Sequence, residues 1–492
     1  MRILLTSAEM TPFAKTGGLA DITASLPIEW EKQGQETIIV MPKYAHIDVY
    51  AYGFKPTFMV VYVPISSWME FAHVWKGYLP NSNVPVYLLE NNDYFNRRGI
   101  YGDPHEYPDN DRRFIFLSRA VFEVARMVDF TPDVIHAHDF HTAFTMAFLK
   151  SQYRHDPKFS KTAGIYTIHN LAYQGWFNPQ RSLDFAGFGM KEFYPGSWFE
   201  HKSAVNAMKT GIMFADKITT VSPTYAKEIR HPYFSEGLQD VLNAKGGDLI
   251  GILNGIYYNE WDPEKDIYLH SKYNKDYLQG KRINKINFLK ETGLNDSDEL
   301  NLPLVGMVSR LTEQKGIDLL IDKLEYFLSN NLFRFALLGS GESRYEDFFR
   351  YLAWKYPKRV YVNIGYNNIL SHRIISGADF MVLPSRFEPC GLTQMYALKY
   401  GTIPIVRKTG GLADTIEEYN PSTKKGNGFT FINYNADDFA YAVNRALALY
   451  NNGTDWNKIR LNAMQCDFSS SRSALEYLKV FKWAIDKARP VK

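Results

Sequence analysis

The sequence predicts an α/β fold of two Rossmann-like domains that face each other across a cleft. Short β-branched runs alternate with helical patterns in both halves of the chain, which favours parallel sheets covered on both faces. A polar stretch from Glu264 to Leu302 separates the two series, and the heptapeptide Lys-Thr-Gly-Gly-Leu-Ala-Asp occurs once in each half. Ligands of open α/β sheets bind beyond the carboxyl ends of the strands, so we expect the site between the two sheets.

The first half carries the strand candidates of an N-terminal domain. Between them, Phe114–Val128 has the apolar spacing of three and four residues that indicates a helix. The strand candidates are Ile3–Thr6, Thr37–Val40, Pro85–Leu89, Val134–His136, Gly164–Ile168 and Ile218–Val221.

The second half repeats the alternation after the polar stretch. We place an N-terminal domain at residues 1–262 and a C-terminal domain at 263–475. Residues 476–492 are expected to form a helix that packs back on the N-terminal domain. The strand candidates of this half are Leu304–Val308, Phe335–Leu338, Val360–Ile364, Phe380–Leu383 and Ile403–Val406.

Composition excludes several classes of function. The 492 residues are 45% hydrophobic and 22% charged, with a net charge of +3, so no nucleic-acid partner is indicated. No apolar run has membrane-spanning length and no signal peptide precedes the first strand, so we expect a cytoplasmic protein without a membrane partner. Two cysteines exclude a disulfide framework. The aromatic content of 15% fits a carbohydrate enzyme, although core packing explains any single ring more simply.

Both copies of the heptapeptide, Lys15–Asp21 and Lys408–Asp414, follow an apolar run. A helical pattern comes next, at Leu19–Leu26 and at Leu412–Glu418. A strand, a glycine turn and a helix N-terminus can hold phosphate, because backbone N–H groups point outward and the helix dipole favours negative charge. Two unrelated turns that need glycine for a positive φ would produce the same pattern.

Polar residues gather where predicted strands end. His136, His138, Asp139 and His141 lie close enough in sequence to suggest a zinc site. Alternation along a strand would put His136 and His138 on the same side, with Asp139 capping the next helix. The cap is the simpler interpretation, and we expect no metal and no cofactor.

Charged residues follow two strands of the second half. Arg310 and Lys315 could clamp a diphosphate near a helix start, although two solvated surface charges would look the same. Glu388 precedes Cys390 and Gly391, and it could accept sugar hydroxyls or complement a helix dipole.

Taken in order, these motifs resemble those of bacterial glycogen synthases and plant starch synthases, from Met1 to about Tyr477. The resemblance implies a GT-B fold and a retaining hexosyltransferase that moves glucose from ADP-glucose to the non-reducing 4-hydroxyl of an α-1,4-glucan such as glycogen. A UDP-glucose donor and a catalytically silent glucan-binding protein are the alternatives. The motifs are Lys15–Leu19, His136–Asp139, Thr167–Gly175, Ser309–Gly316 and Pro384–Leu392.

The resemblance also implies roles for single residues. Tyr257 departs from the family pattern, which usually has an aspartate after Asn254-Gly-Ile256. The implied catalytic residues are His169, Arg310, Lys315, Glu388 and Asp139. The implied donor-binding residues are Lys15, Gly17, Gly18, Asn254, Cys390, Gly391, Leu392 and Thr393, and the implied acceptor-binding residues are Asp21, Tyr101 and Asn170.

Overall fold

The computed structural model describes residues 1–103, 105–294 and 302–489, which form two compact units. The first unit comprises Met1–Gly255 and the C-terminal segment from Ser470, and the second comprises Ile256–Ser469. The units therefore change at 255/256 and 469/470, whereas the sequence suggested 262/263 and 475/476. Ile256 bridges to Ser469, and Trp261 packs in the same core cluster as Tyr273, so residues 256–262 belong to the second unit.

The first unit is built on a sheet with the strand order β12-β11-β7-β6-β1-β2-β5-β4-β3. The strands from β12 to β5 are parallel, and those in the middle are buried along nearly their whole length, as expected for a sheet covered on both faces. The predicted parallel strands of this unit are thereby confirmed. Their bounds are β1 Arg2–Thr6, β2 Glu36–Pro42, β5 Pro85–Glu90, β6 Val134–His138, β7 Ala163–Ile168, β11 Lys217–Thr220 and β12 Leu249–Gly251.

An antiparallel hairpin that the sequence analysis did not predict forms one edge of this sheet. It consists of β3 (Lys55–Ile65) and β4 (Trp68–Tyr78), and β4 also pairs antiparallel with β5. One face of the hairpin is buried and the other is open, since Tyr62 and Phe71 pair across the strands and are both exposed. A small separate sheet contains β8 (Trp176–Phe177), β10 (Ala204–Asn206) and β9 (Glu200–His201).

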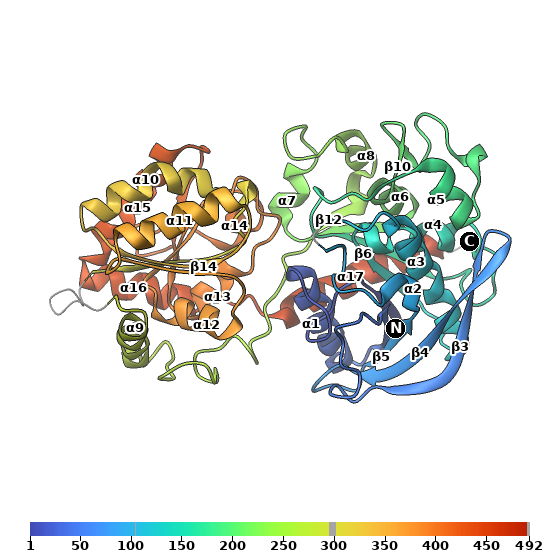
Figure 1. Cartoon of the computed structure of the whole chain (residues 1–492), viewed down its shortest axis with the longest axis horizontal. Coiled ribbons are helices and arrows are strands. Elements are labelled where there is room, and N and C mark those ends of the chain that lie inside the picture. Colours follow the sequence, from blue (N-terminus) through green and yellow to red (C-terminus); the bar gives the residue numbers. More distant parts are fainter. Residues whose placement is uncertain (104, 295–301, 490–492) are drawn as a thin grey trace. The chain divides into compact units, whose positions relative to one another are not determined.

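Helices cover the sheet of the first unit, and the C-terminal helix is one of them (Figure 1). The indole Nε1 of Trp30 donates to the carbonyl oxygen of Ala474 at 3.2 Å, and its ring packs against Tyr477 and Phe481. The helices are α1 Gly18–Lys32, α2 Asn92–Phe95, α3 Asn110–Met127, α4 Phe144–Lys150, α5 Pro179–Ala186, α6 Ala207–Phe214, α7 Pro223–Glu228, α8 Gln239–Ala244 and α17 Ser470–Ala488, with short 3-10 turns η1 Phe140–Thr142, η2 Met190–Glu192 and η3 Gly246–Asp248.

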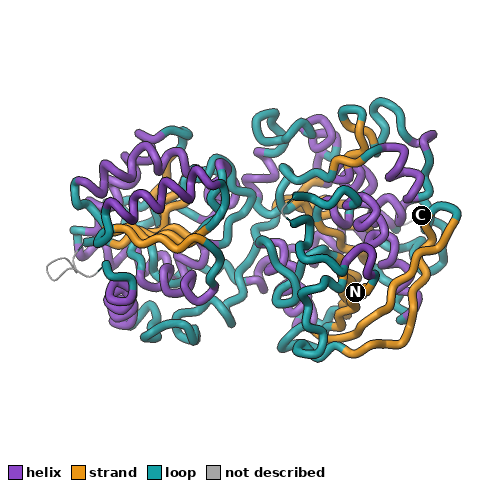
Figure 2. The backbone as a smooth tube through the Cα atoms, in the orientation of Figure 1, coloured by secondary structure: helices purple, strands orange, loops and turns teal. Residues whose placement is uncertain are grey.

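The second unit has a parallel sheet with the strand order β15-β14-β13-β16-β17-β18. Helices α10 and α11 lie on one side of β14, and α12 and α13 lie on the other (Figures 1 and 2). The predicted parallel strands of this half are confirmed. The strands are β13 Leu304–Val308, β14 Arg334–Gly339, β15 Val360–Ile364, β16 Phe380–Leu383, β17 Ile403–Arg407 and β18 Phe429–Phe431. The helices are α9 Gln279–Glu291, α10 Ile317–Ser329, α11 Ser343–Lys355, α12 Asn368–Gly377, α13 Thr393–Lys399, α14 Gly410–Thr415, α15 Ala436–Tyr450 and α16 Gly453–Met464, with η4 Glu313–Lys315.

Part of the predicted polar stretch is ordered structure, because it contains α9, which packs against α12. Two predicted segments lie outside the described residues: 295–301 of the polar stretch and 490–492 of the C-terminal helix. In the part of the chain that the structure describes, no helix combines the length and the apolar character needed to cross a membrane.

Two lysines of α9 differ in charge environment. Lys281 is 3% exposed and donates to the carbonyl oxygen of Ser376 and the hydroxyl of Thr402, and burial lowers its pKa to about 7. Lys285 lies 2.6 Å from Asp379. Burial opposes the charge of Lys285, but the Asp379 carboxylate prevails and raises the pKa of this ammonium.

Replacing Lys281 with methionine should stabilise the second unit. The folded pKa of Lys281 is about 7 against an ordinary 10.5, so the unfolded chain binds this proton more tightly and rising pH stabilises the wild type across that interval. We expect K281M to raise the stability by roughly 1–3 kcal/mol at neutral pH and the gain to shrink toward about pH 9. Urea unfolding at both pH values measures this. The control variant K285M leaves the buried Asp379 carboxylate without its cation and should lower the stability of the second unit. A stability gain of K281M that grows with pH would contradict the interpretation.

Candidate functional site

The carboxyl ends of β6 and β7 bring the predicted histidines together. His136 and His138 project on the same side of β6, with ring centroids 4.1 Å apart, as the strand alternation predicted. His136 Nε2 lies 2.6 Å from the Thr167 hydroxyl, and His138 Nδ1 lies 3.0 Å from His169 Nε2. Burial lowers the pKa of His136 and of His138 well below the usual value, so both rings are neutral at neutral pH.

Asp139 does not cap the next helix with its side chain, which corrects the simpler interpretation of this residue. Its carboxylate instead accepts the backbone N–H of His169 at 2.7 Å and interacts with the amide of Asn170. Burial raises the pKa of Asp139 to about 7, against the opposing effect of these amides. The backbone of Asp139 has φ 53° and ψ −177°, a conformation that a non-glycine residue adopts only when its surroundings enforce it.

Two predicted acceptor-binding residues, Tyr101 and Asn170, have contacts within the protein. The Tyr101 ring stacks on the His141 ring with centroids 4.4 Å apart. The Asn170 side-chain oxygen accepts the backbone N–H of Ala172. Across residues 1–103, 105–294 and 302–489, the structure contains no group of three or more His, Cys, Asp or Glu side chains arranged to hold a metal ion.

Glu9, a residue that no motif indicated, binds the backbone of the turn that contains the first glycine pair. Glu9 is 3% exposed, and its carboxylate accepts the backbone N–H of Thr16 at 2.6 Å and of Gly17 at 3.0 Å, together with the hydroxyl of Tyr101. The expectation that the amides of this turn point outward is therefore wrong for Thr16 and Gly17. The Lys15 ammonium is paired with Asp21 at 2.7 Å, so a predicted donor-binding and a predicted acceptor-binding residue meet here.

Asn254 has an unsatisfied side chain in the loop after β12. Its residue is 5% exposed, and its side-chain oxygen has no hydrogen-bond partner among the described residues. Buried polar atoms are nearly always paired, so an orphan acceptor at a strand end is a candidate for contact with a ligand. Tyr257, the departure from the family pattern, opens a turn of the second unit and its hydroxyl accepts from the Asn259 side chain.

Lys315 and the buried Glu388 form a partly buried ion pair in the second unit. Lys315 Nζ lies 2.6 Å from Glu388 Oε2, which also accepts the Ser385 hydroxyl at 3.0 Å. Lys315 is therefore not a solvated surface charge, and Glu388 has a specific cation as its partner rather than only a helix dipole. The side chain of Arg310 is exposed after β13, at the same edge of the sheet.

The loop after Glu388 is shaped by a glycine and a glutamine. Gly391 has φ +72°, which a side chain would strain, and the Gln394 amide donates to the carbonyl oxygens of Cys390 and Gly391 at 3.0 Å each. Helix α13 starts at Thr393 with Leu392 as its cap residue. The predicted donor-binding residues Cys390, Gly391, Leu392 and Thr393 thus form one continuous turn into a helix.

The second copy of the heptapeptide packs against this same loop. The Gly411 N–H donates to the carbonyl oxygen of Glu388 at 3.1 Å, and a Cβ at Gly411 would overlap the Cys390 carbonyl. Gly410 has φ +44° and no room for a Cβ beside Glu388. In the first copy a Cβ at Gly17 would meet nothing within 4 Å.

The two copies also begin their helices one residue apart. Helix α1 starts at the second glycine, Gly18, whereas α14 starts at the first, Gly410. The helix predicted for Leu412–Glu418 ends at Thr415, because the chain becomes extended there and Glu418 bridges to Gly428.

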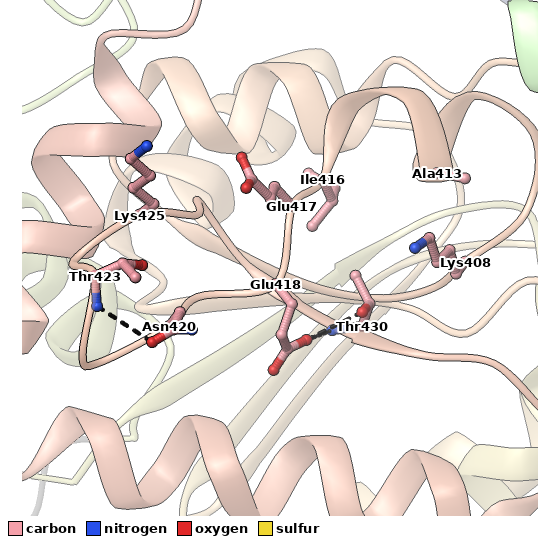
Figure 3. A pocket seen from close by; sticks show the side chains of 9 residues that line it. All are labelled: Lys408, Ala413, Ile416, Glu417, Glu418, Asn420, Thr423, Lys425 and Thr430. Carbon is pink, nitrogen blue, oxygen red and sulfur yellow. Dashed lines mark hydrogen bonds between the residues drawn. The ribbon is translucent and has the colours of Figure 1, made fainter.

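Lys408 of the second copy lines a pocket of about 410 Å³ (Figure 3). The pocket has mixed charge, and the Glu418 carboxylate in it is already bonded to the backbone and hydroxyl of Thr430. Neither Lys315 nor Glu388 lines it. The lining residues are Lys408, Ala413, Ile416, Glu417, Glu418, Asn420, Thr423, Lys425 and Thr430.

Two Rossmann-like sheets are the architecture of the GT-B class of glycosyltransferases, and two family models place the chain in that class. Residues 2–244 match the starch synthase catalytic domain model, and residues 294–460 match the model of glycosyl transferases group 1. The chain belongs to the family of glycogen synthases and starch synthases.

Relatives align over almost the whole chain. The glycogen synthase of Alkaliphilus metalliredigens is 40% identical over 98% of this chain and 99% of its own. That of Fervidobacterium nodosum is 41% identical over 99% of this chain and 100% of its own. The solved catalytic domain of Starch Synthase IV from Arabidopsis thaliana, bound to ADP and acarbose, has a TM-score of 0.90 and 32% identity, and the match covers 99% of both chains.

The contrast between the two glycine pairs predicts that alanine is tolerated in one turn and destabilises the other. Gly17→Ala adds a methyl group in open space at φ −153°, and the stability should change by less than about 0.5 kcal/mol. Gly411→Ala forces the methyl group against Cys390 and should destabilise the second unit by about 1–3 kcal/mol. Urea unfolding of both variants measures the difference. Equal loss of stability would show that the packing of the two turns is alike.

Proposed function

We propose that the enzyme transfers glucose from ADP-glucose to the non-reducing 4-hydroxyl of an α-1,4-glucan, with retention of the anomeric configuration. The observation that supports the proposal most is the ion pair of Lys315 and Glu388, because a cation suited to a leaving diphosphate lies beside a carboxylate suited to sugar hydroxyls. Support for the adenine donor comes from the Arabidopsis structure, whose bound nucleotide is ADP.

The second unit supplies the groups that answer the charge of the leaving group. When the anomeric C–O bond breaks, negative charge develops on the nucleotide diphosphate, and fixed cations stabilise it most when they are positioned in advance. In the proposal Arg310 and Lys315 bind this diphosphate. Glu388 accepts the 3- and 4-hydroxyls of glucose, and the turn from Cys390 to Thr393 brackets sugar and phosphate with its amides.

The first unit supplies contacts to the sugars and a further cation. Asn254 offers its unpaired side-chain oxygen to a hydroxyl of the donor glucose, and His169 contacts the 6-hydroxyl. Lys15 binds the donor phosphates beside Gly17 and Gly18, sharing its charge with Asp21. Asp139 lies near the reacting sugars. Asp21, Tyr101 and Asn170 are assigned to the acceptor.

Retention follows from attack on the face that the diphosphate leaves. In this step the C1–O bond to the phosphate breaks, the acceptor O4 bonds to C1, and its proton passes to the departing phosphate oxygen. Retaining glycosidases instead pair a nucleophilic carboxylate with a second carboxyl group. The hydrogen-bond partners of Glu388 Oε2 are an ammonium and a hydroxyl, which favours the same-face return. A trapped glucosyl adduct on Glu388 would contradict it.

One assay separates the proposed function from its alternatives. Purified protein is incubated with glycogen and either ADP-glucose or UDP-glucose, and nucleotide release and chain elongation are measured. We expect release and elongation with ADP-glucose. A preference for UDP-glucose would reassign the donor, whereas glycogen binding without release from either donor would indicate a silent glucan-binding protein.

Arg310→Ala should lower turnover without unfolding the protein. The side chain is exposed, so we expect a stability change within about 0.5 kcal/mol. Loss of a preorganised charge should lower kcat by about 100-fold or more. Lys315→Ala is a less clean test, because it strands the buried Glu388. Steady-state kinetics and urea unfolding of R310A test this prediction, with the surface variant R350A as the control. Comparable losses of stability and of activity in R310A would show that Arg310 has a structural role.

A further inference from the structure

Two histidines share one hydrogen bond at the ends of β6 and β7. His138 Nδ1 lies 3.0 Å from His169 Nε2, and the two rings are tilted by 42°. His138 is the last residue of β6, and His169 directly follows β7, its parallel neighbour. A contact of this length between ring nitrogens needs one N–H and one lone pair, so the protons of the two rings are not independent.

Both rings are neutral at neutral pH. Burial lowers the pKa of His138 well below its usual value, and protonation of His136 or His169 would lower it further. The packing around His169 lowers its pKa to about 3, although the residue is partly accessible. Two neutral imidazoles carry one N–H each, which leaves two arrangements of the protons that satisfy the shared bond.

The two arrangements differ in what they leave at His138 Nε2. His138 is 0% exposed, and its Nε2 has no hydrogen-bond partner among the described residues. If His169 donated, His138 would carry its proton on Nε2 as a buried N–H without an acceptor. If His138 donates from Nδ1, only a lone pair is left unsatisfied. Buried donors without acceptors are rarer than buried acceptors without donors, so the second arrangement is favoured.

We propose that His138 is a positioning residue that holds His169 in the tautomer with its proton on Nδ1. His169 then presents an N–H donor, and no lone pair, on the ring nitrogen that His138 does not bind. Asp139 accepts the backbone N–H of His169, so two consecutive residues fix its backbone and its ring. An N–H donor suits the oxygen of a sugar hydroxyl, and this last step rests on the proposed function.

The tautomer of His169 can be measured without substrate. Long-range proton–nitrogen NMR spectra of protein labelled with nitrogen-15 histidine distinguish the protonated ring nitrogen from the bare one, and the His169→Gln spectrum assigns the signals. We expect Nδ1 of His169 to be protonated. Protonation of Nε2 instead would overturn the proposal. Because no donor or glucan is needed, this result stays separate from any failure of the transfer assay.

A matched pair of variants tests the role in turnover. Asparagine and leucine have similar shapes, but only the asparagine amide can donate from the place of Nδ1. We expect H138N to keep the tautomer and to stay within about threefold of the wild-type kcat. H138L should lose the tautomer and lower kcat about tenfold with little change in KM, the equivalent of one hydrogen bond.

The control for the variants is H136L. His136 is equally buried on the same strand, but its ring contacts Thr167 rather than His169, so H136L reports the effect of removing a buried histidine while the His169 tautomer stays unchanged. Equal kcat and equal spectra for folded H138N and H138L would overturn the proposal. If H138L does not fold, the tautomer in the wild type and in H138N decides the matter.

Discussion

Parallel strands that are covered on both faces leave polar side chains one place to gather, the ends of the strands. Both units of this chain obey that constraint. In the first unit β6 and β7 end at His138 and Ile168, and the loops that follow carry Asp139 and His169. In the second unit the loops after β13 and β16 carry Lys315 and Glu388, which form an ion pair. The position of the candidate site residues is thus a consequence of sheet burial.

Buried carboxylates hold these loops to one another. Glu9 binds the amides of the first glycine turn, Asp139 binds the amide of His169, and Glu388 binds the ammonium of Lys315. Asp139 and Glu388 each reach from their own loop to a neighbouring one, whereas Glu9 ties together the two ends of its own loop between β1 and α1. Groups fixed in this way need little reorganisation when charge develops, which is the condition for efficient electrostatic stabilisation.

Much of the fold could be predicted from periodicity, because buried parallel strands are short apolar runs and the helices between them repeat every three or four residues. The hairpin of β3 and β4 was missed, since its exposed Tyr62 and Phe71 break the polar–apolar alternation. In the site, alternation along β6 correctly put His136 and His138 on one side. The contact of Asp139 with His169 and that of Glu9 with Tyr101 join residues far apart in sequence, and no spacing reveals them.

The two copies of the heptapeptide have the same sequence but different local structures. In the first copy the helix starts at the second glycine, and the Glu9 carboxylate binds the backbone of the turn. In the second copy the helix starts at the first glycine, and both glycines pack against the backbone of Glu388 and Cys390. The same seven residues therefore adopt two local structures, because the Glu9 carboxylate binds the backbone of one copy and the Glu388–Cys390 backbone packs against the other.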